Sequence, residues 1–380
     1  MECQKHLFQL PGEIHYLNCA YMAPLMRSVE EVGIEGLRKK RDPTRIRPVD
    51  FFSDVDELRI KFGKLVNGPS SQIALMPSVS YGMNSVIRNI PYVKGQHALT
   101  ISEEFPSCYY TAQRWCRTHG AELKVVVGKE DVPERGADWN ERILEAIKPE
   151  TAFLVMASVH WMNGTKFDLQ QIGQRCREVG ARLIVDGSQS VGALPINLRQ
   201  LAIDALVCAG YKWLMGPYST ALSYIHEDFN QGIPLEESWM SRPGADKFES
   251  LTDYTQDYKP GAARFDMGQS SNFISVPMMN EALRQLLEWG VTEIQEYCRR
   301  LSAPFISFCE QHDVAVDEEA FRAHHLLGIQ VPGQMDGDDL LKVLQERRIF
   351  VSLRGNNLRV SFHLFNHDGD IRQLMEALMQ

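Results

Sequence analysis

Asp186 and Lys212 are the two residues of this sequence best placed to do chemistry together. Each follows a short apolar run, residues 183–185 before the acid and 205–208 before the lysine, and such runs are typical of buried strands. Polar residues at the carboxyl ends of strands in an open α/β sheet face the ligand. A lysine there can form a Schiff base with an aldehyde cofactor, and an acid can hold a pyridinium nitrogen. The pair therefore predicts pyridoxal phosphate, bound through Lys212.

A longer pattern surrounds this pair. The segment reads VDGSQ at 185–189 and continues with Gly192, Asp204, GYKW at 210–213 and GP at 216–217. In this order the residues resemble the cofactor-lysine segment of class V aminotransferases, a family of fold type I pyridoxal-phosphate enzymes. Taken one at a time, an acid at a turn and a lysine on the surface are usually just solvated. The whole pattern favours the family.

The resemblance implies further cofactor contacts. By position, Gln189 donates to the 3-oxygen of the cofactor, while Tyr211, Ser80 and the backbone of Val79 hold its phosphate. A physical reason supports the last two, because residues 73–76 are typical of a strand that runs directly into a helix. A helix N-terminus offers unpaired N–H groups and the positive end of the helix dipole to an anion. The alternative is that this turn is an ordinary helix cap that binds no ligand.

Phe105 is the candidate for stacking on the pyridine ring. It follows an expected strand at residues 97–102 and begins the run FPS at 105–107. An aromatic side chain there can lie against a flat ring. Many relatives place a histidine at this point, and the FPS run resembles the kynureninase and isopenicillin N epimerase branches. Simple core packing of a phenylalanine is the alternative.

Arg359 is the candidate for binding the substrate. The run LRVSFHLFN at 358–366 resembles the family's substrate-carboxylate motif. A guanidinium binds a carboxylate through two parallel hydrogen bonds, which fixes its orientation as well as attracting it. The alternative is an arginine exposed on a strand edge.

Three positions depart from the family pattern. Trp161 stands where relatives have an asparagine, Ala209 supplies no hydroxyl to the phosphate, and Gln269 replaces a threonine that in relatives completes the phosphate site of the neighbouring subunit. Either Gln269, Ser270 or neither residue takes that place. The surrounding motif still implies a homodimer with shared active sites.

The roles of His160, Trp161 and Asn163 stay open. Each lies just after an expected strand at residues 152–158 and could line the pocket. His160 is a candidate second acid or base, and a buried histidine with a structural role is the alternative.

The elements needed to position these residues are visible in the pattern of the chain. Short apolar runs alternate with helical periodicity, which predicts βαβ units and an α/β fold with a mostly parallel sheet sandwiched by helices. We expect a large cofactor-binding domain at residues 16–265. A smaller α+β domain is expected from residues 1–15 and 275–380, with a hairpin at Gly355-Asn356.

Two further local features are expected in the large domain. A helix at residues 51–66 is expected to be capped by Asp50 or Ser53. The polar stretch at 231–259 is expected to form a long loop around the mouth of the active site.

Composition narrows the choice of partner and compartment. The 380 residues carry a net charge of −9 without a basic block, so neither nucleic acid nor an acidic membrane is an expected partner. Eight cysteines lack a CxxC pair or metal-ligand spacing, and the N-terminus lacks the apolar core of a signal peptide. The protein is therefore expected in the cytoplasm and without a bound metal. The family resemblance implies a small-molecule amino-acid substrate as its partner.

The expected activity is that of an aminotransferase. Kynureninase-like hydrolysis is the second candidate, isopenicillin N epimerase-like racemisation the third, and β-elimination uses the same machinery. Cysteine desulfurases carry a catalytic cysteine on a loop before the arginine motif, and residues 352–357 contain none. The alternative from a different functional class is a non-enzymatic protein, either cofactor-binding or structural.

Overall fold

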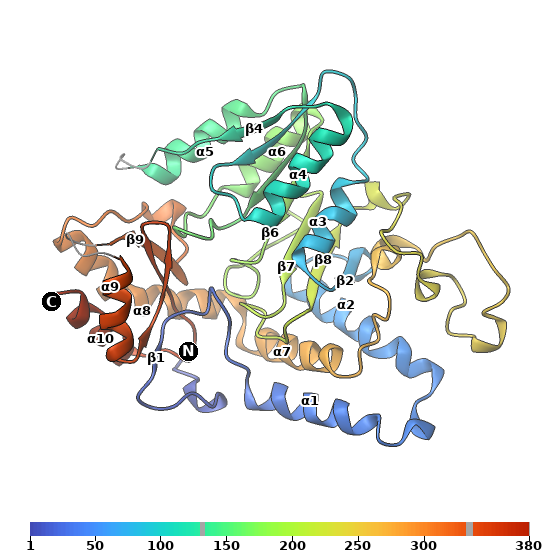
Figure 1. Cartoon of the computed structure of the whole chain (residues 1–380), viewed down its shortest axis with the longest axis horizontal. Coiled ribbons are helices and arrows are strands. Elements are labelled where there is room, and N and C mark those ends of the chain that lie inside the picture. Colours follow the sequence, from blue (N-terminus) through green and yellow to red (C-terminus); the bar gives the residue numbers. More distant parts are fainter. Residues whose placement is uncertain (130–133, 332–336, 380) are drawn as a thin grey trace.

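A seven-stranded sheet forms the centre of the molecule (Figure 1). The structure is a computed structural model and describes residues 1–129, 134–331 and 337–379. All neighbouring strands pair in parallel except at β8, which runs antiparallel to both of its neighbours. This confirms the expected α/β fold with a mostly parallel sheet. In spatial order the strands are β2 (Ile73–Met76), β8 (Ala221–Ile225), β7 (Ala205–Ala209), β6 (Arg182–Asp186), β5 (Thr151–Ala157), β3 (His97–Ile101) and β4 (Leu123–Val126).

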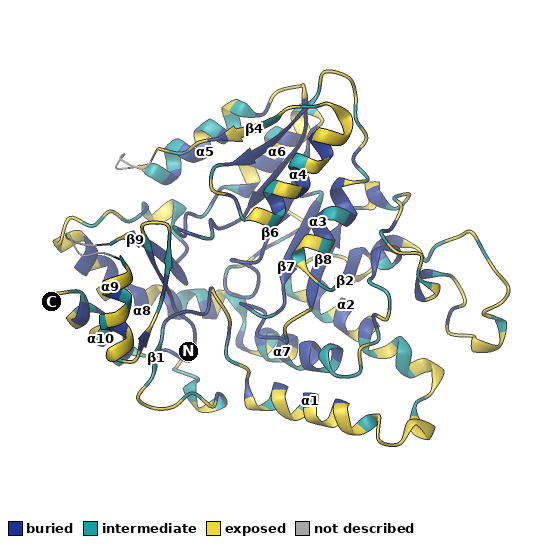
Figure 2. Ribbon diagram, viewed as in Figure 1, coloured by how far each residue is buried: buried dark blue, intermediate teal, exposed yellow. Residues whose placement is uncertain are grey.

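The inner strands are mostly apolar because helices cover both faces of the sheet. In β6, Leu183 and Val185 pack into one hydrophobic core and Ile184 into a second core on the opposite face. Successive side chains of a strand point to opposite faces of the sheet, so neighbouring residues pack into different cores. Figure 2 shows the central strands almost wholly buried. The burial on both faces explains why these segments appear in the sequence as continuous apolar runs.

Two groups of helices make the covering layers. One face packs against α3 (Val79–Ile87) and α4 (Pro106–His119). The other face packs against α2 (Ser53–Leu65), α5 (Arg135–Ala146) and α6 (Leu169–Val179). Helix α7 (Ser275–Trp289) packs beside α2, and α1 (Arg27–Lys39) packs on α7.

The C-terminal part forms a smaller α+β unit (Figure 1). Its sheet has the order β11 (Ser352–Arg354), β12 (Asn357–Ser361) and β9 (Leu326–Gln330), and the predicted hairpin at Gly355-Asn356 joins β11 to β12. Strand β1 (His15–Tyr16) pairs in parallel with β10 (Ile349–Phe350). Three helices complete the unit: α8 (Val291–Gln311), α9 (Gly337–Glu346) and α10 (Asp368–Leu378). The domain boundaries given above stay a prediction.

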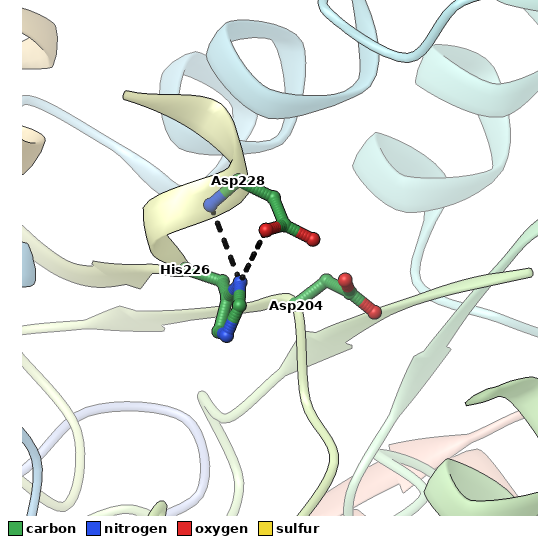
Figure 3. Close-up of side chains that lie close together, drawn as sticks. All are labelled: Asp204, His226 and Asp228. Atoms are coloured by element: carbon green, nitrogen blue, oxygen red, sulfur yellow. Dashed lines mark hydrogen bonds and ion pairs between the residues drawn. The ribbon is translucent and has the colours of Figure 1, made fainter. Parts of the chain in front are cut away.

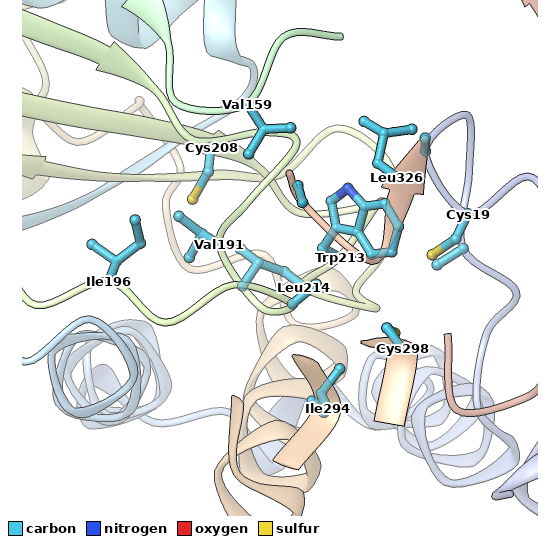
Figure 4. Close-up of a cluster of buried hydrophobic side chains, with 14 of the residues drawn as sticks. Cys19, Val159, Val191, Ile196, Cys208, Trp213, Leu214, Ile294, Cys298 and Leu326 are labelled. Atoms are coloured by element: carbon cyan, nitrogen blue, oxygen red, sulfur yellow. The ribbon is translucent and has the colours of Figure 1, made fainter. Parts of the chain in front are cut away.

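A buried cluster joins this unit to the central sheet (Figure 4). Its centre is Trp213, which has no exposed surface and lies one residue beyond Lys212. Around it gather Cys208 from β7, Cys298 from α8 and Leu326 from β9. The segment that carries the lysine is therefore anchored in both parts of the fold.

Two local predictions were wrong. Helix α2 begins at Ser53 after Phe52 and has no side-chain cap, because the Asp50 carboxylate accepts instead from the Arg47 N–H at 2.7 Å in a preceding 3₁₀ turn. The stretch at 231–259 is irregular as expected, but part of it projects away from the body of the molecule (Figure 1), and it lines neither cavity of the candidate site. No helix of the described residues combines the length and the apolar character that crossing a bilayer requires.

Candidate active site

Two adjoining cavities open at the carboxyl ends of β5, β6 and β7. The first has a volume of about 300 Å³ and includes the last residue of each of these strands: Ala157, Asp186 and Ala209. The second, of about 290 Å³, is bounded by the N-terminal segment 20–22 and by the β11–β12 hairpin. Five residues line both: Phe105, Trp161, Tyr211, Lys212 and Tyr218. The cavities therefore meet at the lysine.

Asp186 lines the first cavity as the last residue of β6. Only 5% of it is exposed. One carboxylate oxygen accepts from the Ser188 N–H at 2.8 Å, and the other lies 3.5 Å from the Cys108 thiol. A carboxylate has about four acceptor positions, so these donors orient Asp186 and leave capacity for a cationic N–H in the cavity.

Lys212 is buried in the wall between the two cavities. Burial lowers the pKa of its ammonium to about 8, against the opposing effect of Asp186, and the guanidinium of Arg359 lowers it further. Its Nζ lies 5.6 Å from the centre of the Phe105 ring and 5.8 Å from that of Tyr211. A lysine with a depressed pKa has a larger neutral fraction near neutral pH, and the neutral amine is the nucleophile.

Gln189 is fixed by two partners. Its Oε1 accepts from the indole of Trp213 at 2.9 Å, which assigns Nε2 as the donor. One hydrogen of Nε2 goes to the carbonyl of Ala20 at 3.1 Å. The amide carries a second hydrogen, and the residue lines the first cavity, where it can serve an oxygen of a ligand.

The N-termini of α3 and α4 converge on the first cavity. Ser78 caps α3 by accepting from the Tyr81 N–H, and Val79 and Ser80 form the first turn. Ser80 Oγ lies 2.8 Å from Oγ of Ser107, which is in the first turn of α4. The positive ends of two helix dipoles and several hydroxyl groups therefore lie at the same end of the first cavity, an arrangement that favours binding of an anion. Ser107 was missed as a site residue, because its closeness to Ser80 arises only from the packing of α4 on α3.

Phe105 forms part of an aromatic wall. Its ring meets Trp161 edge to face at a centroid distance of 5.5 Å, and Tyr211 packs on Tyr218 at 4.6 Å. The Glu104 carboxylate fixes the backbone here by accepting from the N–H of Phe105 at 2.6 Å and of Ala157 at 2.7 Å. Burial and the nearby Asp186 raise the pKa of Glu104 to about 8. Sequence reasoning had not singled out Glu104, since nothing local marks it as buried.

Arg359 lies in the wall of the second cavity, on β12, with 2% of its surface exposed. Its Nη1 donates to the carbonyl of Trp161 at 2.9 Å. Nε and Nη2 are buried without a hydrogen-bond partner among the described residues. Burial lowers the pKa of this guanidinium to about 9. Unpaired buried donors are costly, and a carboxylate in the cavity would satisfy them.

Several other candidates lie outside both cavities. His160 is fully buried against Trp139, and burial lowers its pKa to about 4. This favours the structural alternative over a second acid or base. Asn163 accepts from the Thr165 N–H and faces a different hollow. Of the three residues left open, only Trp161 lines the site.

The two candidates for a shared phosphate site also lie away from this chain's own cavities. Ser270 is buried with its hydroxyl 3.9 Å from the sulfur of Met240. Gln269 is exposed and has a left-handed backbone, with φ of 56°. An exposed side chain at this place is available to a second chain, whereas the buried hydroxyl is not.

A separate polar cluster has the composition of a metal site. Asp204, His226 and Asp228 bring one ligand atom each within 4.8 Å of one another (Figure 3). The guanidinium of Arg182, however, pairs with both carboxylates, at 2.6 Å from Asp204. Because the guanidinium of Arg182 already neutralises these carboxylates, we assign the cluster a structural role and not a metal site: its ion pairs hold β6 next to the start of β7.

The first cavity fits pyridoxal phosphate by the chemistry of its donors. Lys212 can attach the aldehyde, Asp186 can pair with the pyridinium nitrogen, and Gln189 can donate to the ring oxygen. The helix N-termini at Ser80 and Ser107 suit the phosphate. All seven residues predicted to bind this cofactor line this one cavity: Val79, Ser80, Phe105, Asp186, Gln189, Tyr211 and Lys212. The eighth predicted residue, Arg359, lies in the adjoining one.

Comparison with known proteins gives relatives along most of the chain. An uncharacterized aminotransferase, YcbU, of Bacillus subtilis (strain 168) is 23% identical over 326 residues, covering 84% of this chain and 82% of the relative. Isopenicillin N epimerase of Streptomyces clavuligerus is also 23% identical, covering 95% of this chain and 93% of that protein.

A solved structure supports the same fold. A mutant of C-DES, with glycine covalently linked to its pyridoxal-phosphate cofactor, superposes with a TM-score of 0.88 at 20% identity and covers 99% of this chain and 98% of that one. The family model described as Aminotransferase class-V matches residues 47–374. The chain therefore belongs to the class V aminotransferase family.

Proposed function

We propose that this protein is an aminotransferase that acts on the α-amino group of an amino acid. Its cofactor is pyridoxal phosphate. The single observation that carries the proposal is the position of Lys212 between a cavity that contains Asp186 and a cavity that contains Arg359. A substrate whose carboxylate binds Arg359 has its α-carbon directed toward the lysine.

Each residue then has a defined task. Arg359 binds and orients the carboxylate through its unpaired Nε and Nη2. Lys212, when free, takes the proton from the α-carbon and returns it, for which a pKa of about 8 is well matched to neutral pH. Asp186 supplies a fixed negative charge that keeps the ring nitrogen opposite it protonated. When bound, the cofactor accepts the electrons released by loss of the α-proton.

The arrangement of cysteines argues against a desulfurase. All eight are free thiols, and none lines either cavity. The β11–β12 hairpin that precedes Arg359 is too short to carry a reactive thiol loop. Free thiols also support our placement of the enzyme in the cytoplasm.

The lysine assignment is tested by absorbance. The purified protein should show the band of lysine-bound cofactor between roughly 410 and 430 nm. Lys212→Ala should remove it, whereas Lys148→Ala, which changes an exposed lysine, should not. Persistence of the band in Lys212→Ala would disprove the assignment. Borohydride reduction followed by peptide mass mapping should place the cofactor on Lys212.

The reaction type is tested by a screen of donors and acceptors. An aminotransferase should lose the lysine-bound band on mixing with an amino donor and regain it with a keto acid. Release of alanine from kynurenine without an acceptor would favour the hydrolase instead. Loss of optical activity without amino transfer would favour a racemase.

We propose a homodimer as the working state. Gln269 is exposed outside its own chain's site, and Ser78 and Ser80 at the phosphate end are exposed in the single chain. A second subunit that covers this end would exclude water from the phosphate and could bring its own Gln269 to it.

A further inference from the structure

The second cavity contains a second guanidinium, that of Arg354. Arg354 is the last residue of β11, opposite Asn357, and Ser352 lies opposite Arg359. Residues opposite each other share a face of the sheet, and so do residues two apart on one strand. Arg354 and Arg359 are therefore diagonal neighbours on one face, at a spacing of about 7–8 Å.

Among the described residues that line the cavity, none is an acid that could pair with these two cations. The other charged residue in its lining is Lys212, and the remaining lining residues are uncharged: Ala20, Tyr21, Met22, Phe105, Trp161, Tyr211 and Tyr218. Within the described part of the chain, Arg354 makes one hydrogen bond, from Nη1 to the carbonyl of Leu353 at 2.7 Å, and no ion pair. Burial lowers the pKa of Arg354, and its charge in turn lowers the pKa of Arg359.

A single bound carboxylate would not balance the positive charges of both Arg354 and Arg359. An α-carboxylate that binds the two free nitrogens of Arg359 uses one guanidinium fork. Arg354 then remains half-buried beside the guanidinium of Arg359, which is unfavourable unless a second anion approaches. The diagonal spacing suits two carboxylates on one small molecule better than two contacts to one carboxylate.

We propose that Arg354 binds a second carboxylate in the substrate side chain, so that the enzyme acts on dicarboxylic amino acids such as aspartate and glutamate. The proposal rests on the proposed function for its catalytic consequence. The binding of a dicarboxylate to the arginine pair can be measured without any reaction.

The test uses ligands that lack an amino group. Binding of glutarate and succinate to the cofactor-loaded protein is compared with binding of butyrate by titration calorimetry in a chloride-free buffer. Wild type should prefer the dicarboxylates. Arg354→Met should weaken glutarate or succinate by about 10- to 100-fold, the loss expected for hydrogen bonds to a charged group, and leave butyrate unchanged. Arg359→Met should weaken all three.

Two variants serve as controls. Arg299→Met removes a surface arginine, paired with Glu296 on α8, and should change no affinity. Arg354→Lys keeps the charge but loses the planar fork, so its affinity for glutarate should lie between those of wild type and Arg354→Met. Retention of the lysine-bound absorbance band shows that each variant is folded.

Two results would overturn the proposal. Equal binding of butyrate and glutarate by wild type would show that no second carboxylate is bound. Equal weakening of both ligands in Arg354→Met would show that the two arginines share one carboxylate. Failure of every amino acid to change the cofactor band would reject the proposed aminotransferase and leave the calorimetric result standing.

Discussion

At the scale of single residues, the proposed chemistry depends on the pKa of Lys212, which the residues around Lys212 set. Burial and the guanidinium of Arg359 lower this pKa, while Asp186 opposes them. Since Lys212 lines both cavities, one amine serves the cofactor site beside Asp186 and the substrate site beside Arg359.

This balance predicts the pH dependence of cofactor attachment. The rate at which the cofactor-free protein takes up pyridoxal phosphate should rise with pH and level off above a midpoint near pH 8, because only the neutral amine attacks. Arg359→Met should move the midpoint upward, since removing a nearby positive charge favours the ammonium. Stopped-flow absorbance measures the rate. A wild-type midpoint near that of a free lysine would contradict the environment described, and Arg299→Met should leave it unchanged.

At the scale of elements, the turn after β7 is the critical connection. It carries Lys212 into the site and Trp213 into the cluster of Figure 4, where the indole also holds Gln189. The ring of Trp213 further packs edge to face on His325 at 4.5 Å. One peptide unit thus couples the lysine to the packing between the sheet and the C-terminal unit.

Truncation of this anchor should be costly. Trp213→Ala should lower the free energy of unfolding by about 3–5 kcal/mol, as expected for a large buried aromatic, and should also weaken cofactor retention because Gln189 loses its orienting donor. Tyr110→Ala, at a position on α4 that is 64% exposed, should cost much less. Urea unfolding monitored by circular dichroism gives both values. Similar losses for the two variants would contradict the anchoring role.

The sequence was sufficient for the elements that carry their own local pattern. Buried strands such as β6 and β7 are visible as apolar runs, and the Gly355-Asn356 turn marks the hairpin between β11 and β12. Pairings between distant segments were not predictable. The approach of Ser107 to Ser80, the proximity of Arg354 to Arg359 and the outward course of residues 231–259 depend on packing that no local periodicity encodes.

At the scale of the whole molecule, the exposed parts point to assembly. The projecting stretch at 231–259 exposes Trp239, Phe248, Leu251 and Tyr254, which lie on a segment that lines neither cavity of this chain's site. Isolated exposed apolar residues are common, but several on one projecting segment are typical of an interface. We therefore expect this stretch to pack on the partner subunit.

The expected mass in solution is that of two chains. Sedimentation equilibrium of the wild type should give a dimer, and Trp239→Asp combined with Tyr254→Asp should shift it toward the monomer, because charges at an apolar interface are penalised. Lys148→Asp, at an exposed position just before β5, should not change the mass. A monomeric wild type at micromolar concentration would refute the shared active site.

The unpaired nitrogens of Arg359 also have a consequence for folding itself. A guanidinium that gives up water without gaining a partner costs free energy in the native state and none in the unfolded chain. Any carboxylate that enters the second cavity offsets that cost and is absent from the unfolded state, so its binding adds directly to the stability of the fold. The protein is therefore expected to be most stable when a carboxylate substrate occupies the second cavity.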